Sequence, residues 1–175
     1  MNTIIPGKFT GIIQLAFSDT AALQSLQSQV LSYFPNHQPI GKLHVTLLHQ
    51  SYPKKYGSGK SRGDKLLKGL YKEGGQFSIQ PPMIQLDDVY VASDGSREST
   101  YVTIQEQGLL MTIRDQILQA ADIPLDALGI TEEEPNPEGR IFHVSLTNLT
   151  GNGGDSIAYP NLASDKRLFN VSEVM

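Results

Sequence analysis

Two short motifs in this chain place a histidine two residues before a hydroxyl side chain. The first motif, HVTL, contains His44 and Thr46, and the second, HVSL, contains His143 and Ser145. Side chains two residues apart point to the same face of a β-strand, so each motif predicts a histidine and a hydroxyl group side by side. The apolar residues that alternate with them predict that the other face of each strand is buried.

Two strands of this kind that face each other across a cleft would bring two imidazole rings to one site. The unperturbed pKa of histidine is about 6.5, so one ring can be neutral and the other protonated near neutral pH. The neutral ring can remove a proton from a nucleophile while the protonated ring donates a proton to a leaving oxygen. Thr46 and Ser145 would donate hydrogen bonds to phosphate oxygens, whose charge grows in the transition state. The motifs therefore predict cleavage of a phosphodiester by an adjacent 2′-hydroxyl, without a metal or another cofactor. The spacing does not assign the acid and the base between His44 and His143.

The elements around the two motifs are expected to repeat along the chain. In chain order, periodicity predicts a strand over 9–17, a helix over 18–34, a strand over 42–49, a helix over 64–75, a strand over 77–80, a hairpin over 84–107, a helix over 108–123 and a strand over 141–149. A strand and a helix precede each motif strand, which predicts two similar lobes that face each other. The predicted fold class is therefore α+β, with two pseudo-symmetric sheet-plus-helix lobes around a central cleft.

Alternation and helical spacing also predict which side chains share a face. The histidine faces are expected to hold Lys42, His44, Thr46 and Leu48 in the first motif strand and Ile141, His143, Ser145 and Thr147 in the second. The buried faces are expected to hold Leu43, Val45 and Leu47 in the first and Phe142, Val144, Leu146 and Leu149 in the second. The stripes expected to face the core are Leu23, Leu26, Val30 and Leu31 in the first flanking helix, with Asp19 as its N-cap, and Leu109, Ile113, Ile117 and Ala120 in the second.

Length and composition favour a single domain over residues 1–175. The chain has 175 residues, no cysteine and a net charge of −4. The absence of cysteine excludes disulfides and cysteine-bound zinc, and it fits a reducing cytoplasm. The N-terminal sequence lacks the pattern of a signal peptide, and the apolar runs are too short to cross a bilayer. We therefore expect a cytoplasmic protein that does not associate with membranes; no feature of the sequence predicts an oligomeric state.

The basic residues are concentrated in one part of the chain. Between Lys42 and Lys72 there are eight lysine or arginine residues and one acidic residue, Asp64. A local basic patch on an acidic protein suits a small anionic ligand better than long nucleic acid, which the net charge disfavours. An exposed loop kept soluble by its lysines explains the same composition equally well.

The motifs HVTL and HVSL, one in each half of a chain of this size, resemble the two signature motifs of the 2H phosphoesterase superfamily. The resemblance implies a bilobal α+β fold with a pseudo-twofold cleft and metal-independent phosphodiesterase activity. It also implies that His44 and His143 are the acid–base pair and that Thr46 and Ser145 hold the phosphate. It covers most of the chain in element order, but about eight residues in sequence.

Within that superfamily, the compact chain and the segment HVSLTNLTGNGGDS look most like the phage phosphodiesterases that counter CBASS antiviral signalling. That similarity implies a 3′,3′-linked cyclic di- or trinucleotide substrate, such as cyclic GMP-AMP, opened to a linear product in the cytoplasm of a host bacterium. Two alternatives stay open. One is an RNA-end enzyme that opens 2′,3′-cyclic phosphates, and the other is a non-catalytic protein that sequesters the cyclic nucleotide.

Four further residues are candidates for binding such a substrate. Lys42 shares the strand face of the first histidine and could contact phosphate. The chain has no tryptophan, so Tyr52 and Tyr56, in the basic segment, are the candidates for stacking on bases. Glu173, together with Phe169, lies in the C-terminal tail, which is expected to close over the cleft.

Overall fold

The computed structural model describes residues 4–9, 14–48, 79, 81–120 and 123–174, and the elements given below belong to these residues. Tyr52, Tyr56 and the helix expected over 64–75 lie outside the described residues, as does all but one residue of the strand expected over 77–80. The described part of the chain combines α-helices with antiparallel β-strands, which confirms the expected α+β class.

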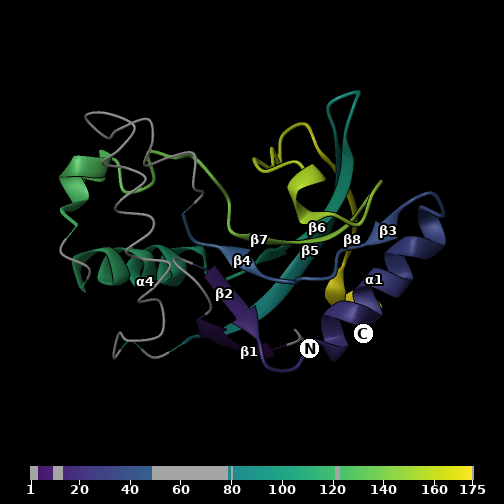
Figure 1. Ribbon diagram of the computed structural model, residues 1–175, viewed down its shortest axis with the longest axis horizontal. Coiled ribbons are helices and arrows are strands. Elements are labelled where there is room, and N and C mark those ends of the chain that lie inside the picture. The colour runs from purple at the N-terminus through teal and green to yellow at the C-terminus, as the bar shows by residue number, and fades with distance from the viewer. Residues whose placement is uncertain (1–3, 10–13, 49–78, 80, 121–122, 175) are drawn as a thin grey trace.

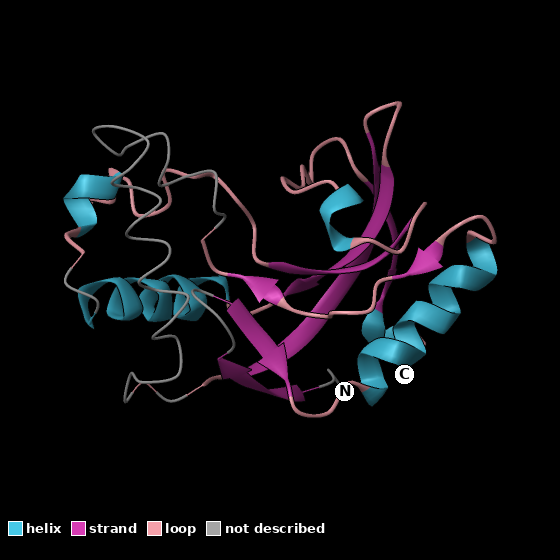
Figure 2. Cartoon of the chain, viewed as in Figure 1, coloured by secondary structure: helices cyan, strands magenta, loops and turns pink. Residues whose placement is uncertain are grey.

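The helices and strands follow one another as two similar series (Figures 1 and 2). The strands are β1 (Ile4–Phe9), β2 (Gln14–Phe17), β3 (Gln38–Pro39), β4 (Val45–Thr46), β5 (Met83–Ser93), β6 (Glu98–Ile104), β7 (His143–Asn148) and β8 (Lys166–Asn170). The α-helices are α1 (Ala21–Tyr33) and α4 (Gln107–Ala120), and the 3-10 helices are η1 (Leu125–Leu128), η2 (Gly153–Asp155) and η3 (Val171–Glu173). A hairpin, an α-helix and a motif strand therefore occur in the same order in each half, as β1, β2, α1 and β4 and as β5, β6, α4 and β7.

The order of the strands in the sheet is symmetric about the two motif strands. The hydrogen-bonded path runs β1–β2–β4–β7–β6–β5–β8, and β3 also pairs with β7. The motif strands β4 and β7 are neighbours at its centre, with β2 and β6 outside them and β1 and β5 outside these. Because β1 pairs with β5 as well as with β2, these six strands close into a ring.

The strand expected over 9–17 is wrong, because this segment belongs to two strands. β1 ends at Phe9 and β2 begins at Gln14, and the two pair antiparallel with Phe9 opposite Leu15. The run FTGIIQLAF contains one glycine and none of the proline, asparagine or aspartate residues that mark a turn. Its mostly apolar character therefore resembles a single buried strand, and only the strand pairing reveals the reversal.

The first helix buries most of the predicted stripe, with one substitution. Leu23, Leu26 and Val30 are buried, but the fourth member of the buried face is Gln27, whereas Leu31 is partly exposed. The side-chain amide of Gln27 donates to two backbone carbonyl oxygens that belong to different segments, those of Ile40 and Leu146, at 2.9 Å each. This polar side chain can be buried because both of its donors are satisfied. The helix N-cap is Thr20, and the expected cap Asp19 instead accepts a hydrogen bond from the amide of Ala21.

The second helix buries a face that is rotated from the predicted one. Ile113 and Ile117 are buried as expected, but Leu109 and Ala120 are exposed. The remaining buried positions are Leu110, Arg114 and Leu118. Hydrophobic periodicity does not predict that Arg114 is buried. Its guanidinium is buried because it binds Asp115 and the carbonyl oxygen of Pro135. Figure 1 shows α4 and α1 toward opposite ends of the molecule.

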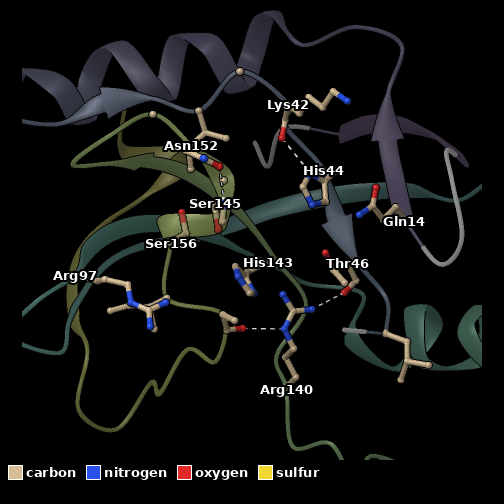
Figure 3. Close-up of a pocket in the computed structure, with 18 residues that line it drawn as sticks. Gln14, Lys42, His44, Thr46, Arg97, Arg140, His143, Ser145, Asn152 and Ser156 are labelled. Atoms are coloured by element: carbon tan, nitrogen blue, oxygen red, sulfur yellow. Dashed lines mark hydrogen bonds between the residues drawn. The ribbon is translucent and has the colours of Figure 1, made fainter. Parts of the chain in front are cut away.

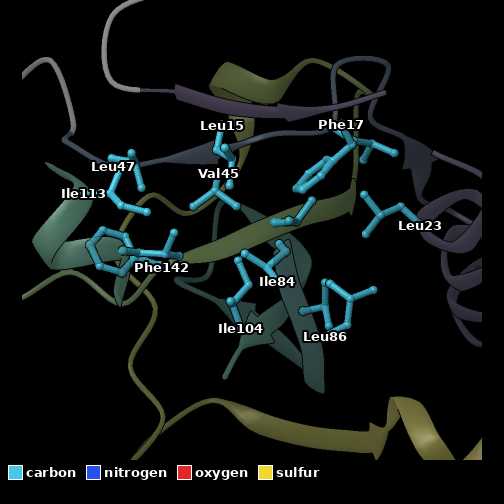
Figure 4. Packing of buried hydrophobic residues seen from close by; sticks show 14 of the residues in the cluster. Leu15, Phe17, Leu23, Val45, Leu47, Ile84, Leu86, Ile104, Ile113 and Phe142 are labelled. Carbon is cyan, nitrogen blue, oxygen red and sulfur yellow. The ribbon is translucent and has the colours of Figure 1, made fainter. Parts of the chain in front are cut away.

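The hydrophobic core packs against one face of the sheet (Figure 4). The paired residues Leu15, Val45, Val144 and Val102 form one row across β2, β4, β7 and β6, and each is fully buried. Paired residues point to the same face of a sheet, and the residues before and after them on each strand point to the opposite face. His44 and His143 are adjacent to the valines of this row, so they lie on the face opposite the core. The core thus holds the two motif strands together and directs their polar side chains away from it.

Candidate active site

The two motifs are brought together by direct pairing of their strands. Val45 pairs with Val144 in antiparallel orientation. In such a pair the neighbouring positions match in reverse, so His44 lies opposite Ser145 and His143 lies opposite Thr46. The two histidine–hydroxyl pairs are therefore related by a local twofold axis that passes between the valines. The sequence predicts that the motifs face each other across a cleft, whereas the structure joins them as neighbours in one sheet.

The predicted alternation holds up to Ser145 and fails beyond it. Ser145 pairs with Tyr101 on β6, but Thr147 pairs with Thr100, because the register shifts between these positions. Thr100 and Tyr101 are adjacent on β6 and therefore point to opposite faces of the sheet, and each shares its face with its partner on β7. Thr147 therefore points away from the face of Ser145. Thr147 is fully buried, against the expectation that it lies beside the histidines. Leu149, expected in the core, lies beyond the end of β7 and is exposed.

The histidine-bearing face opens into a cavity of about 770 Å³, which we call the histidine cavity (Figure 3). The four motif residues His44, Thr46, His143 and Ser145 all line it, as does the predicted phosphate contact Lys42. The other polar side chains that line it, none of which the sequence indicated, are Gln14, Arg97, Arg140, Asn152 and Ser156. The structure therefore assembles one site from both halves of the chain.

Each cavity histidine is held in the same way by the segment that leads into its motif strand. The Nδ1 atom of His44 lies 2.9 Å from the carbonyl oxygen of Lys42, and that of His143 lies 2.8 Å from the carbonyl oxygen of Ile141. A carbonyl oxygen only accepts hydrogen bonds, so Nδ1 must carry the hydrogen in both rings. In the neutral ring Nε2 then carries the lone pair that can accept a proton. Both histidines are thus set in the tautomer that a general base requires at Nε2.

Burial lowers the pKa of both histidines. For His143, burial is the largest cause and the nearby charge of Arg140 the next, and together they lower the pKa to about 3. For His44, burial again is the largest cause of a lowered pKa, and Arg140 and Lys42 act in the same direction. The bond from Nδ1 to a carbonyl opposes these effects in each case. Both rings are therefore neutral at neutral pH in the free protein, whereas the sequence-based expectation was one neutral and one protonated ring.

The ring of His143 is further restrained by Tyr101. The two rings meet edge to face, with centroids 5.3 Å apart and an interplanar angle of 68°. Tyr101 is buried, stacks on Tyr90, and donates its hydroxyl hydrogen to the carboxylate of Asp165 at 2.7 Å. Because Tyr101 is itself held on both sides, it limits the motion of His143.

Arg140 is a site residue that the sequence analysis missed. Its side chain is buried, and it donates to the carbonyl oxygen of Thr46 from Nη1 and to that of Ala158 from Nε, each at 2.8 Å. Burial lowers the pKa of Arg140, and the charges of Glu138 and Tyr159 act in the opposite direction. One signal could have found it, because Arg140 is the only lysine or arginine between Arg114 and Lys166 in the sequence and stands shortly before the second motif.

The histidine cavity has the electrostatic character of an anion site. Three cationic side chains, from Lys42, Arg97 and Arg140, line it, and no aspartate or glutamate does so among the described residues. The charge of Glu138 acts on the buried guanidinium of Arg140, and an anion bound in the cavity compensates its positive charge further. Within the described residues, no cluster of three or more metal-binding side chains was found.

The wall formed by residues 148–156, which we call the Asn148 loop, is organised by one buried side chain. The amide of Asn148 donates to the carbonyl oxygen of Asn152 at 2.6 Å and to Oγ of Ser156 at 3.0 Å. Its Oδ1 accepts from the backbone amides of Thr150 and Gly151. The segment GNGGDS, which the sequence shows only as turn-rich, is therefore a defined wall of the cavity.

The C-terminal tail does not reach the histidine cavity. Residues Lys166–Asn170 form β8, which pairs with β5 at the edge of the sheet. Phe169 is buried in the core, and Glu173 forms an ion pair with Arg167 at 3.2 Å. Neither residue lines the cavity, so the structure does not bring the candidate Glu173 to the site. The candidates Tyr52 and Tyr56 lie outside the described residues.

Comparisons with models of protein families, with curated proteins and with solved structures found no match to this chain. Separately, no helix in the described part of the chain combines the length and the apolar character needed to span a bilayer.

Proposed function

We propose that this protein is a metal-independent phosphodiesterase of the 2H phosphoesterase type that opens 3′,3′-linked cyclic di- or trinucleotides, such as cyclic GMP-AMP, to linear products. Its setting would be phage evasion of CBASS antiviral signalling in the bacterial cytoplasm. One observation carries the proposal: two histidines, each held in the same tautomer, share a cation-lined cavity with two hydroxyl side chains related by a local twofold axis. The symmetric strand order supports the two-lobed fold of that superfamily.

The proposed reaction uses the two histidines in turn. Nε2 of one neutral histidine takes the proton of a ribose 2′-hydroxyl, whose oxygen attacks the adjacent 3′-phosphorus. The bond from phosphorus to the 5′-oxygen breaks, and the second, protonated histidine gives its Nε2 proton to that oxygen. The product is a linear nucleotide with a 5′-hydroxyl and a 2′,3′-cyclic phosphate. Water can then open the cyclic phosphate with the roles of the histidines reversed, which leaves a phosphomonoester.

The bound phosphate supplies the negative charge that favours a protonated histidine, which the free site lacks. Both histidines are neutral without ligand, and a bound phosphodiester places a negative charge beside them, which raises their pKa values. Thr46 and Ser145 are placed to donate hydrogen bonds to its non-bridging oxygens, and Arg140 to neutralise the charge that grows on them. The substrate thus helps to create the acid that its own cleavage requires.

The size and charge of the cavity support a small anionic substrate. Its volume of about 770 Å³ is within the range typical of small-ligand sites. The net charge of −4 argues against a long RNA, for which a basic surface is the usual footprint. The RNA-end alternative nevertheless shares the second half of the proposed reaction, because opening a 2′,3′-cyclic phosphate needs the same two histidines.

Turnover assays in EDTA separate the three functions. The wild type is incubated with 3′,3′-cyclic GMP-AMP and with an RNA that ends in a 2′,3′-cyclic phosphate, and the products are separated by chromatography. We expect cyclic GMP-AMP to be opened, and we expect His44→Ala and His143→Ala each to lower its turnover by at least a hundredfold, as for the loss of a general acid or base. The control variant Lys166→Ala, which changes an exposed residue of β8, should retain wild-type activity.

Three outcomes would contradict parts of this proposal. Turnover that survives both histidine substitutions would exclude the mechanism. Turnover of the RNA end alone would favour the RNA-end enzyme. Tight binding of cyclic GMP-AMP without turnover in the wild type would favour a sequestering protein.

A further inference from the structure

The histidine cavity extends beyond the motif residues to a second cation, Arg97. Arg97 ends the turn between β5 and β6, and its side chain lines the cavity. In Figure 3, Arg97 and Ser156 lie on one side of the cavity and Lys42 and His44 on the other, with His143 between them. Positive charge is therefore present at both ends of one cavity rather than at the motif residues alone.

The two acidic side chains next to Arg97 make their short hydrogen bonds with groups other than its guanidinium. Oδ1 of Asp94 accepts hydrogen bonds from the amides of Ser96 and Arg97 and from the hydroxyl of Ser96, which holds the turn together. Its other oxygen lies 3.8 Å from Nε of Arg97, at the long end of ion-pair distances. Glu98 binds Nε2 of the buried His37 at 2.7 Å. The side chain of Arg97 is 55% exposed and has this one long ion pair, so its other donors are accessible to a ligand in the cavity that it lines.

Ser156 supplies a buried hydroxyl on the same side. The residue is only 7% exposed, and its Oγ accepts a hydrogen bond from the side-chain amide of Asn148 at 3.0 Å. Within the described residues no acceptor is found for its own hydrogen, which leaves that hydrogen for a ligand in the cavity it lines. The amide of the next residue, Ile157, donates to Oγ of Ser99, two positions from Arg97 on the same chain segment, which anchors Ser156 near β6.

We propose that Arg97 and Ser156 form a second phosphate subsite, so that the cavity recognises two phosphodiester groups of one ligand at the same time. This inference rests on the proposed function and deepens it. In a cyclic dinucleotide the two phosphodiesters lie on opposite sides of one ring, so one can lie at the histidines while the other contacts Arg97 and Ser156. A 2′,3′-cyclic mononucleotide has a single phosphate and fills only the subsite at the histidines. The second subsite would therefore select cyclic dinucleotides over 2′,3′-cyclic mononucleotides.

The test compares one ligand with two phosphates and one ligand with a single phosphate. Binding of 3′,3′-cyclic GMP-AMP and of 2′,3′-cyclic AMP is measured by calorimetry in EDTA, in the His44→Ala background so that neither ligand is consumed. Arg97→Ala is expected to weaken the binding of cyclic GMP-AMP at least tenfold, which is the usual scale for a hydrogen bond to a charged group. It is expected to weaken the binding of 2′,3′-cyclic AMP less than twofold. Ser156→Ala should also weaken the binding of cyclic GMP-AMP selectively, and Arg97→Lys should retain part of the affinity that Arg97→Ala loses. The matched control is Arg167→Ala, an exposed arginine that does not line the cavity, and it should change neither affinity.

The outcomes separate the subsite from the proposed function. Equal weakening of both ligands by Arg97→Ala, or no weakening of either, would overturn the second subsite even if the wild type turns over cyclic GMP-AMP. Selective weakening of cyclic GMP-AMP would support the subsite even if the wild type turns over neither compound, in which case only the catalytic proposal fails. Thermal unfolding of each variant verifies that it is folded.

Discussion

At the scale of single residues, the two cavity histidines combine a defined tautomer with a lowered pKa. The bond from Nδ1 to a carbonyl two residues earlier leaves Nε2 as the atom that exchanges protons. Burial and the charge of Arg140 keep both rings neutral in the free protein. At neutral pH either ring of the free protein can therefore accept a proton, and neither is protonated so that it could donate one.

The pH dependence of turnover should reveal this arrangement. Because the pKa of each free histidine lies below its usual value of about 6.5, the protonated acid is present in the free protein only on the acidic side of that value. We expect kcat/KM to be bell-shaped, with its maximum below pH 6.5, and kcat to have its maximum at higher pH, because the bound phosphate raises both pKa values. A profile of kcat/KM that is flat between pH 5 and 9, with chemistry limiting the rate, would contradict the paired-histidine mechanism.

Arg140 should contribute to both stability and catalysis. Arg140→Ala removes the donors to two part-buried carbonyl oxygens, and leaving such a group unsatisfied costs up to about 1–3 kcal/mol. We expect a lower free energy of unfolding in urea and a loss of tenfold or more in kcat/KM. Arg140→Lys keeps the charge but not the planar fork, so it should recover some phosphate affinity and little stability. An alanine variant with wild-type activity would exclude a role for Arg140 at the phosphate.

At the scale of elements, the wall of the cavity depends on how the Asn148 loop packs against β3. Gly151 has a φ of +81°, and a Cβ atom there would lie 3.2 Å from Cβ of Gln38 and 3.3 Å from the carbonyl oxygen of Pro39. Both the backbone conformation and the close approach therefore require glycine. The loop can line the cavity only because no side chain separates it from β3.

Gly151→Ala should be more harmful than a matched glycine substitution elsewhere. Gly95 has a φ of +91° but open space around its Cβ position, so Gly95→Ala measures the backbone cost alone, which is about 1–2 kcal/mol. We expect Gly151→Ala to lower the free energy of unfolding further than Gly95→Ala and to weaken binding of cyclic GMP-AMP. Urea unfolding and calorimetry test this comparison. Equal losses of stability in the two variants would show that the contact with β3 is unimportant.

At the scale of the whole molecule, the site is part of the closed sheet rather than an addition to it. The row of valines and leucine that joins β2, β4, β7 and β6 in the core is the same row that places the histidines on the other face. Burying His143 in this sheet has a cost that depends on pH. Its pKa in the folded protein, about 3, is far below that of an unfolded chain.

Acid should therefore destabilise the fold through His143. Below pH 6.5 the unfolded chain binds a proton at this histidine and the folded protein does not, so stability is lost as the pH falls from about 6.5 toward 3. The slope is up to about 1.4 kcal/mol per pH unit, and His44 acts in the same direction. We expect the wild type to lose stability relative to His143→Gln over pH 6.5 to 4 in urea titrations. If the free energy of unfolding depends on pH in the same way in the two proteins, the lowered pKa of His143 is contradicted.

Several features could be predicted from local pattern. The alternation around His44 predicted that Lys42, Thr46 and Leu48 share its face, and all of them line the cavity. The hairpin of β5 and β6 and the two helices beside the motif strands also followed from periodicity. The reversal between β1 and β2, however, could not be predicted, because a single glycine is the only turn residue in this run and strand pairing alone separates the two strands.

The sequence by itself determined the two histidine–hydroxyl pairs and the face that each pair occupies, because side-chain alternation is a local property of a strand. Only the tertiary structure decided that Val45 pairs with Val144, and this register creates the twofold site. It also decided that Thr147 leaves that face and that Arg140 and Arg97 reach the cavity. These outcomes depend on hydrogen bonds between segments far apart in the chain, such as that from Arg140 to the carbonyl of Thr46, and no local pattern encodes such a partner.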